Sequence, residues 1–70
     1  MQRQKKRLKC YRRLGYRVVV NMAPHEQLEW SAYRPRMQTP AAVGLSATME
    51  AAITTANCWI ANDLHRSCVA

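Results

Sequence analysis

The chain has no phenylalanine, only two glycines and no long apolar run. Gly15 and Gly44 are too far apart to build a glycine-rich phosphate loop. The three valines of residues 18–20 are too few for the apolar region of a signal peptide, and no stretch approaches a membrane span. Seventy residues form at most one small domain, and a homodimer is one way to complete so small a core.

Cysteines are few, and their spacing excludes several classes of site. Cys10, Cys58 and Cys68 are an odd number without a C-x-x-C pair. On one helix, Cys58 and Cys68 would lie about 15 Å apart along the axis, too far for a disulfide. Such thiols are typical of a reduced, cytoplasmic protein. His65 and Cys68 are three residues apart, but no other pair has metal-ligand spacing, so the sequence predicts neither a metal nor another cofactor.

Residues for catalysis are also sparse. The four acids are scattered, and Glu50 and Asp63 lie nearly four turns apart on a predicted helix. No serine, histidine and acid occur in an order that suggests a nucleophile with its base. We therefore expect a protein that is not an enzyme.

Acids are absent from the first 17 residues, which carry eight cations. The rest of the chain has a net charge of −1, and the whole chain has +7. A near-neutral body with a basic arm suggests a polyanion partner, such as nucleic acid or an anionic membrane surface. Cations to bind phosphate and a tyrosine to stack on a base are the candidate nucleic-acid contacts. These residues are Arg3, Lys5, Lys6, Arg7, Lys9, Tyr11, Arg12, Arg13 and Arg17.

The stretch 46–68 contains no glycine and no proline, and apolar residues recur in it every three or four positions. This period predicts an α-helix with one apolar side. Ser46 or Thr48 can cap its start, and Glu50 suits the positive end of the helix dipole. The apolar side consists of Met49, Ile53, Ala56, Ile60 and Leu64.

Three stretches before this helix have the alternation of strands. Residues 16–22 and 28–33 are joined by a short loop with Pro24, which favours an antiparallel hairpin. Residues 41–45 predict a short third strand with Val43 and Leu45 facing inward. On the sheet face away from the helix we expect an ordinary solvent surface, or a weak nucleic-acid platform, formed by Arg17, Glu29, Ser31 and Tyr33.

The predicted fold is α+β, with the order β-β-β-α. A three-stranded antiparallel sheet is covered by one C-terminal helix. Residues 14–70 form this single domain, and residues 1–13 form a flexible basic arm in front of it.

Short motifs resemble a loose group of small, mostly uncharacterised proteobacterial and phage-borne proteins. They are Gly15-Tyr16-Arg17-Val18-Val19-Val20, Leu28-Glu29-Trp30, and Ala47-Thr48-Met49-Glu50-Ala51-Ala52 with Trp59-Ile60. The resemblance covers about residues 15–65 and implies the same β-β-β-α architecture. It implies no activity, and the basic arm is not part of the shared pattern.

The sequence supports two functions of different classes. In the first, a non-enzymatic accessory protein associates with nucleic acid or a nucleoprotein complex through its basic arm, with strong salt dependence. In the second, a phage or mobile-element protein inhibits a host protein complex, in the manner of an anti-CRISPR protein, through contacts of its sheet or helix. A basic tail that only aids solubility and a small structural dimer are further alternatives.

Overall fold

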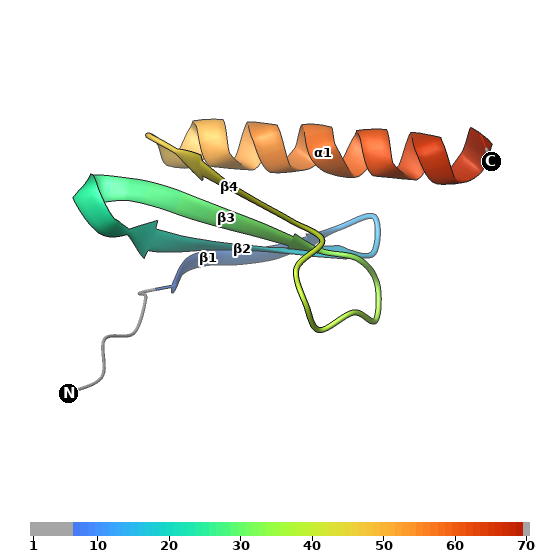
Figure 1. Cartoon of the computed structure of the whole chain (residues 1–70), viewed down its shortest axis with the longest axis horizontal. Helices are drawn as coiled ribbons and strands as arrows, with labels where there is room; N and C mark the ends of the chain where they lie inside the picture. The colour runs from blue at the N-terminus through green and yellow to red at the C-terminus, as the bar shows by residue number, and fades with distance from the viewer. Residues whose placement is uncertain (1–6, 70) are drawn as a thin grey trace.

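The computed structural model describes the backbone of residues 7–69 and the side chains of residues 7–66. It shows a four-stranded antiparallel sheet in the order β1-β2-β3-β4. Figure 1 shows α1 along one face of the sheet, while the loop between β3 and β4 projects on the opposite side. The predicted α+β class with a C-terminal helix is confirmed. The elements are β1 (Arg7–Arg13), β2 (Tyr16–Ala23), the 3₁₀ turn η1 (Pro24–Glu26), β3 (Gln27–Tyr33), β4 (Ala42–Ser46) and α1 (Met49–Val69).

The prediction of three strands is wrong, because residues 7–13 form a fourth. They were expected as part of a flexible arm, but they pair antiparallel with β2 along their length. The Tyr11 hydroxyl also donates a 2.8 Å hydrogen bond to Oδ1 of Asn57 on α1. Repulsion between neighbouring cations suggested a free arm, yet in a strand successive side chains point to opposite faces and the charges separate. The domain therefore includes β1, and residues 1–6 lie outside the described part of the chain.

α1 closes the core mainly through small side chains. The predicted apolar side is confirmed at Ala56 and Ile60, which are completely buried. Met49 and Leu64 are partly buried and pack against the same cluster, and Ile53 is partly buried. Small residues let the helix backbone approach the sheet closely. The buried cluster consists of Tyr16, Val18, Val20, Leu28, Trp30, Ala32, Ala52, Ala56 and Ile60.

β4 packs in the opposite phase from the one predicted. Val43 and Leu45, expected inward, are 52% and 59% exposed. Gly44 instead pairs with Trp30 of β3 on the helix side of the sheet. A Cβ at Gly44 would lie 2.6 Å from Nε1 and 2.7 Å from Cε2 of that indole. The Trp30 ring fills the space that a side chain at position 44 would need. β4 therefore pairs so that Gly44, and not Val43 or Leu45, faces the helix.

Gly44→Ala should destabilise the domain, although Gly→Ala within a strand usually has the opposite effect. Trp30 is only 5% exposed, so its ring has little room to move, and overpacking costs about 1–3 kcal/mol. Urea denaturation followed by tryptophan fluorescence measures the change. In a Trp30→Leu background the substitution should cost less, since the ring that it meets is gone. An equal cost in both backgrounds would contradict this packing.

A two-residue turn connects β1 and β2. Leu14 has a φ of 54° and Gly15 a φ of 87°, which is the pattern of a type I′ hairpin turn. Glycine adopts positive φ readily, whereas leucine does so at a cost in energy. Leu14 is also 64% exposed, so its side chain contributes little to the core.

Leu14→Asn should therefore stabilise the domain, because Asn-Gly is the preferred sequence of this turn. We expect the free energy of unfolding to rise by about 0.5–1 kcal/mol, as measured by urea or thermal denaturation. Leu14→Ala is the control, since it shortens the side chain but keeps the backbone cost. An equal gain with alanine would show that relief of the backbone is not the cause.

Candidate nucleic-acid interface

α1 covers one face of the sheet and leaves the other, the open face, uncovered (Figure 1). Because side chains alternate along each strand, the open face consists of three rows that run across the strands. Arginines gather in these rows on the β1 and β2 side, and apolar residues on the β4 side. The rows are Arg12, Arg17 and Tyr33; Cys10, Val19, Ser31 and Val43; and Arg7, Asn21, Glu29 and Leu45.

A β-bulge brings Arg7 to this face. Between Lys9 and Arg7 the register advances two residues in β1 but only one in β2. Strict alternation would have placed Arg7 on the helix side together with Lys9. The extra residue of the bulge, Leu8, instead turns Arg7 to the open face. There Arg7 lines one hollow together with Cys10 and Arg17. The bulge therefore adds a third arginine to the open face.

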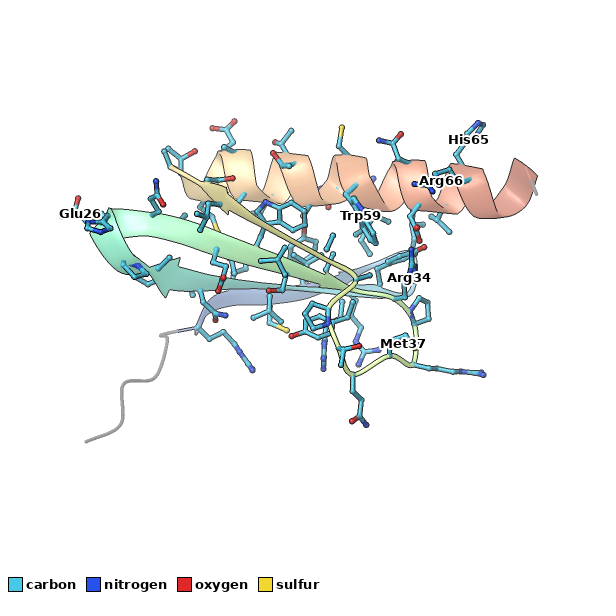
Figure 2. All side chains as sticks on the ribbon, viewed as in Figure 1. Glu26, Arg34, Met37, Trp59, His65 and Arg66 are labelled. Atoms are coloured by element: carbon cyan, nitrogen blue, oxygen red, sulfur yellow. The ribbon has the colours of Figure 1, made fainter. Side chains whose placement is uncertain are left out.

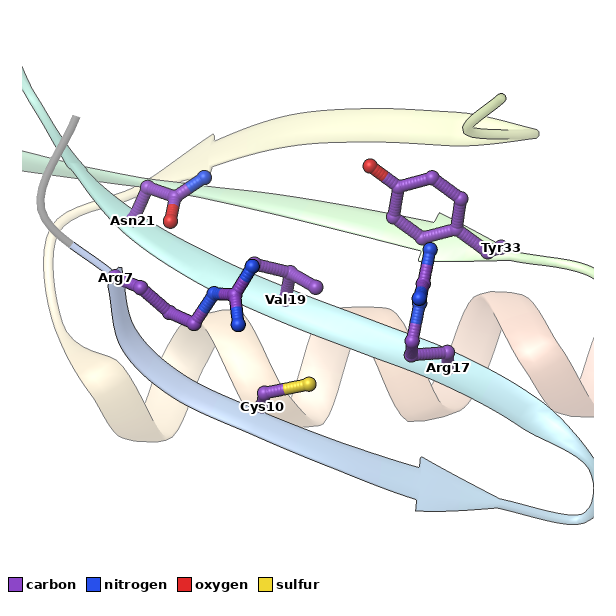
Figure 3. Close-up of a pocket in the computed structure, with 6 residues that line it drawn as sticks. All are labelled: Arg7, Cys10, Arg17, Val19, Asn21 and Tyr33. Carbon is purple, nitrogen blue, oxygen red and sulfur yellow. The ribbon is translucent and has the colours of Figure 1, made fainter. Parts of the chain in front are cut away.

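Arg17 and Tyr33 form the centre of the arginine-rich side. The Arg17 guanidinium lies over the Tyr33 ring, 4.4 Å from its centroid, which is a cation–π contact. A hollow of about 480 Å³ opens beside them (Figure 3). Figure 3 shows Arg7 and Arg17 at opposite ends of this hollow. Its lining residues are Arg7, Cys10, Arg17, Val19, Asn21 and Tyr33.

A second hollow of about 320 Å³ shares Arg17 and Tyr33 with the first. The loop between β3 and β4 forms its wall, and Arg12, Arg34 and Arg36 line it. Two adjoining hollows thus place arginines around a single aromatic ring. The chemistry of this surface suits an extended anion with flat groups.

A buried carboxylate pairs with one of these arginines. Asp63 of α1, only 7% exposed, accepts a 2.5 Å hydrogen bond from the Tyr16 hydroxyl. It also accepts bonds from Nε and Nη2 of Arg34 at 3.0 and 2.7 Å. The Arg34 guanidinium lies 5.6 Å from the Trp59 ring centroid, and Figure 2 shows it reaching toward α1. The charge of Arg34 is therefore neutralised, and we do not count it among the cations for a ligand.

These contacts hold the pKa of Asp63 at about 2, below its ordinary 3.8, mainly through the Arg34 hydrogen bonds and then that of Tyr16. Burial, followed by the bond to Asp63, raises the pKa of Tyr16. A carboxylate with a lower pKa in the folded than in the unfolded chain stabilises the fold above about pH 4. That stabilisation is lost as the pH falls toward about 2.

Asp63→Asn should lower the free energy of unfolding at neutral pH by about 1–2 kcal/mol. The figure is modest because Arg34 is 52% exposed and water screens the ion pair. Between about pH 4 and pH 2 the difference from the wild-type protein should shrink, as measured by urea denaturation across this range. Glu50→Gln removes the same charge from an exposed position of α1 and should keep the wild-type pH dependence. A difference that stays constant down to pH 2 would contradict this assignment.

The predicted contact residues divide between the two faces of the sheet. Arg7, Arg12 and Arg17 share the open face. Tyr11 is held by α1, and Nζ of Lys9 lies 5.9 Å from its ring centroid, so the structure does not bring Tyr11 together with these arginines. The helix side of β1 carries Lys9, Tyr11 and Arg13, whereas Arg3, Lys5 and Lys6 lie outside the described residues.

Other residues of the region differ in how far the sequence predicts them. Arg17 and Tyr33 were expected on the face away from the helix, and this placement is confirmed. The sequence predicted only that Arg36 is exposed, whereas the structure places it at the second hollow. Its position three residues after Tyr33 could have indicated that the two residues lie near each other. The partners of Asp63 lie 47 and 29 residues away in the chain, and no local spacing predicts them.

Known proteins offer no further guide to the site. No family model, curated protein or solved structure matches this chain. Among the described residues, no three His, Cys, Asp or Glu side chains are grouped as a metal ion would require. Residues 7–69 contain no helix with both the length and the apolarity needed to cross a membrane. The open face is therefore the surface from which a function can be inferred.

Proposed function

We propose that this protein is a non-enzymatic binding protein that associates with nucleic acid, free or in a nucleoprotein complex, through its open face. The observation that supports this most is the presence of Arg7, Arg12 and Arg17 together on the one sheet face that α1 leaves uncovered. Guanidinium groups match the geometry of phosphate oxygens. Several of them on one surface bind a polyanion by releasing its counterions.

Other residues on the β1 and β2 side of the open face suit the same ligand, whereas Glu29 lies in the row of Arg7. The first two rows contain no carboxylate, so the arginines there face no acid in their own rows. Tyr33 and the guanidinium of Arg17 stacked on it form a flat surface for a base. Asn21 supplies an amide for hydrogen bonds at the first hollow. We expect binding through phosphates and stacking, with little choice of sequence.

Two charge-matched double variants test this proposal. Arg12→Gln/Arg17→Gln removes two cations from the open face, and Lys9→Gln/Arg13→Gln removes two from the helix side of the same hairpin. With labelled 20-nucleotide DNA and RNA at about 50 mM salt, the first should raise the Kd about tenfold or more, since two phosphate contacts are lost. It should also reduce the slope of log K against log salt by about 2. The second variant should change the Kd by less than about threefold. Fluorescence anisotropy at several salt concentrations measures both.

Equal losses in the two variants would mean that net charge, and not the open face, determines binding. A wild-type protein that binds neither DNA nor RNA at low salt would overturn the proposal. Recovery of a stoichiometric host protein from a nuclease-treated lysate would then favour the inhibitor function. Deletion of residues 1–6 tests the remaining cations of the arm, whereas deletion of residues 1–13 would remove β1 as well.

A further inference from the structure

The two edges of the sheet differ in charge. β1 forms one edge and carries four cations, Arg7, Lys9, Arg12 and Arg13, together with a bulge. Charges and bulges at an edge oppose pairing with another strand. β4 forms the other edge, and none of its five residues is charged. Among the described residues, β4 has a neighbouring strand on one side only.

β4 also exposes the apolar side chains of Val43 and Leu45 on the open face, at 52% and 59% exposure. An uncharged edge with exposed apolar residues is a template for another strand. We propose that two copies of this chain pair antiparallel through β4, which joins their sheets into one of eight strands. Gly44 of one copy then lies opposite Gly44 of the other at the two-fold axis.

The register follows from the sequence of β4. With Gly44 at the axis, all five residues pair, and each Val43 lies opposite Leu45 of the second copy. Both apolar residues of each copy then contact an apolar counterpart across the pair. An axis at Val43 would instead place Leu45 opposite Ala41, and an axis at Leu45 would place Val43 opposite Ala47. Those alternatives pair fewer residues of the strand and leave one apolar side chain opposite an alanine.

Charge determines which edge a second copy can meet, because β1 carries four cations and β4 carries none. The chain carries a net charge of +7, so two β1 edges repel each other, and pairing at β4 keeps them as far apart as the sheet allows. The core is also small, and its largest completely buried side chains are only Ile60, Val18 and Val20. Chains of this size commonly gain stability by association.

The helices leave room for this pairing. α1 contacts β3 more than β2 or β4, so each helix lies roughly above β3. Three strand intervals would separate the two helices, which is about 14 Å and exceeds the 8–10 Å of helices in contact. The two-fold axis is perpendicular to the joined sheet, so the open faces of both copies lie on the same side of it. The arginine clusters of the two copies then lie on the same side of the joined sheet, at its two ends, with the β4 strands between them.

A pair of single-cysteine proteins tests the register. Val43→Cys and Leu45→Cys are each made in a chain whose Cys10, Cys58 and Cys68 are replaced by serine. Opposed residues of antiparallel strands lie about 4.5–5.5 Å apart at Cα, within reach of a disulfide. Under mild oxidation, the mixture of the two proteins should yield at least fivefold more disulfide-linked dimer than either protein yields alone. Equal or no cross-linking in the mixture would overturn the proposed pairing.

Mass in solution provides a second test that is independent of nucleic acid. At about 100 μM the wild-type protein should elute at twice its 8.0 kDa chain mass by light scattering. Val43→Lys/Leu45→Lys should elute as a monomer with unchanged circular dichroism, because both positions are exposed within one chain. Met37→Lys changes another exposed apolar residue, 52% exposed and outside β4, and should stay dimeric. A wild-type protein that is monomeric at this concentration would overturn the proposal. Binding of a strand from another protein at β4, without a dimer of this chain, would overturn it as well.

Discussion

The contact between α1 and one face of the sheet is the interaction on which the structure depends. Ala52, Ala56 and Ile60 bring the helix down onto the central strands, and these three residues are completely buried. One helix covers only one face, so the opposite face has to be compatible with water. On the first three strands the arginines, with Asn21 and Glu29, meet this requirement, while Val19 and Ser31 on the same face are buried. The separation of an apolar side from a cationic side is thus a consequence of having a single helix.

Polar contacts secure the helix where apolar contact is limited. Asn57 accepts a hydrogen bond from Tyr11 on the edge strand β1, and Asp63 binds Arg34 at the end of β3 together with Tyr16 of β2. Directional hydrogen bonds of this kind, one part-buried at Asn57 and three to the buried Asp63, restrict the positions that the helix can take. These two residues therefore help to set the position of α1 above strands with few large side chains.

Much of the architecture is predictable from the sequence, because the helix and the two central strands have clear periods. β1 is not predictable in this way, because repulsion between its cations suggests an unpaired segment. The sequence also does not show that the free edge of β2 is available to pair with it. The phase of β4 is also hidden, because the alternation of Val43 and Leu45 fits either face and only Trp30 decides between them. For the candidate site, composition identifies Arg7, Arg12 and Arg17 as cations. Arg7 joins Arg12 and Arg17 on one face only through a bulge, which strict alternation does not predict.

The position of Cys10 has a practical consequence. Its sulfur lies in the first hollow, between the arginines of the open face, whereas Cys58 is an exposed thiol on α1. A nucleic acid bound at that hollow, as proposed, would shield the Cys10 sulfur from alkylating reagents and leave that of Cys58 accessible. With Cys68 replaced by serine, the alkylation of Cys10 relative to Cys58 would report occupancy of the hollow.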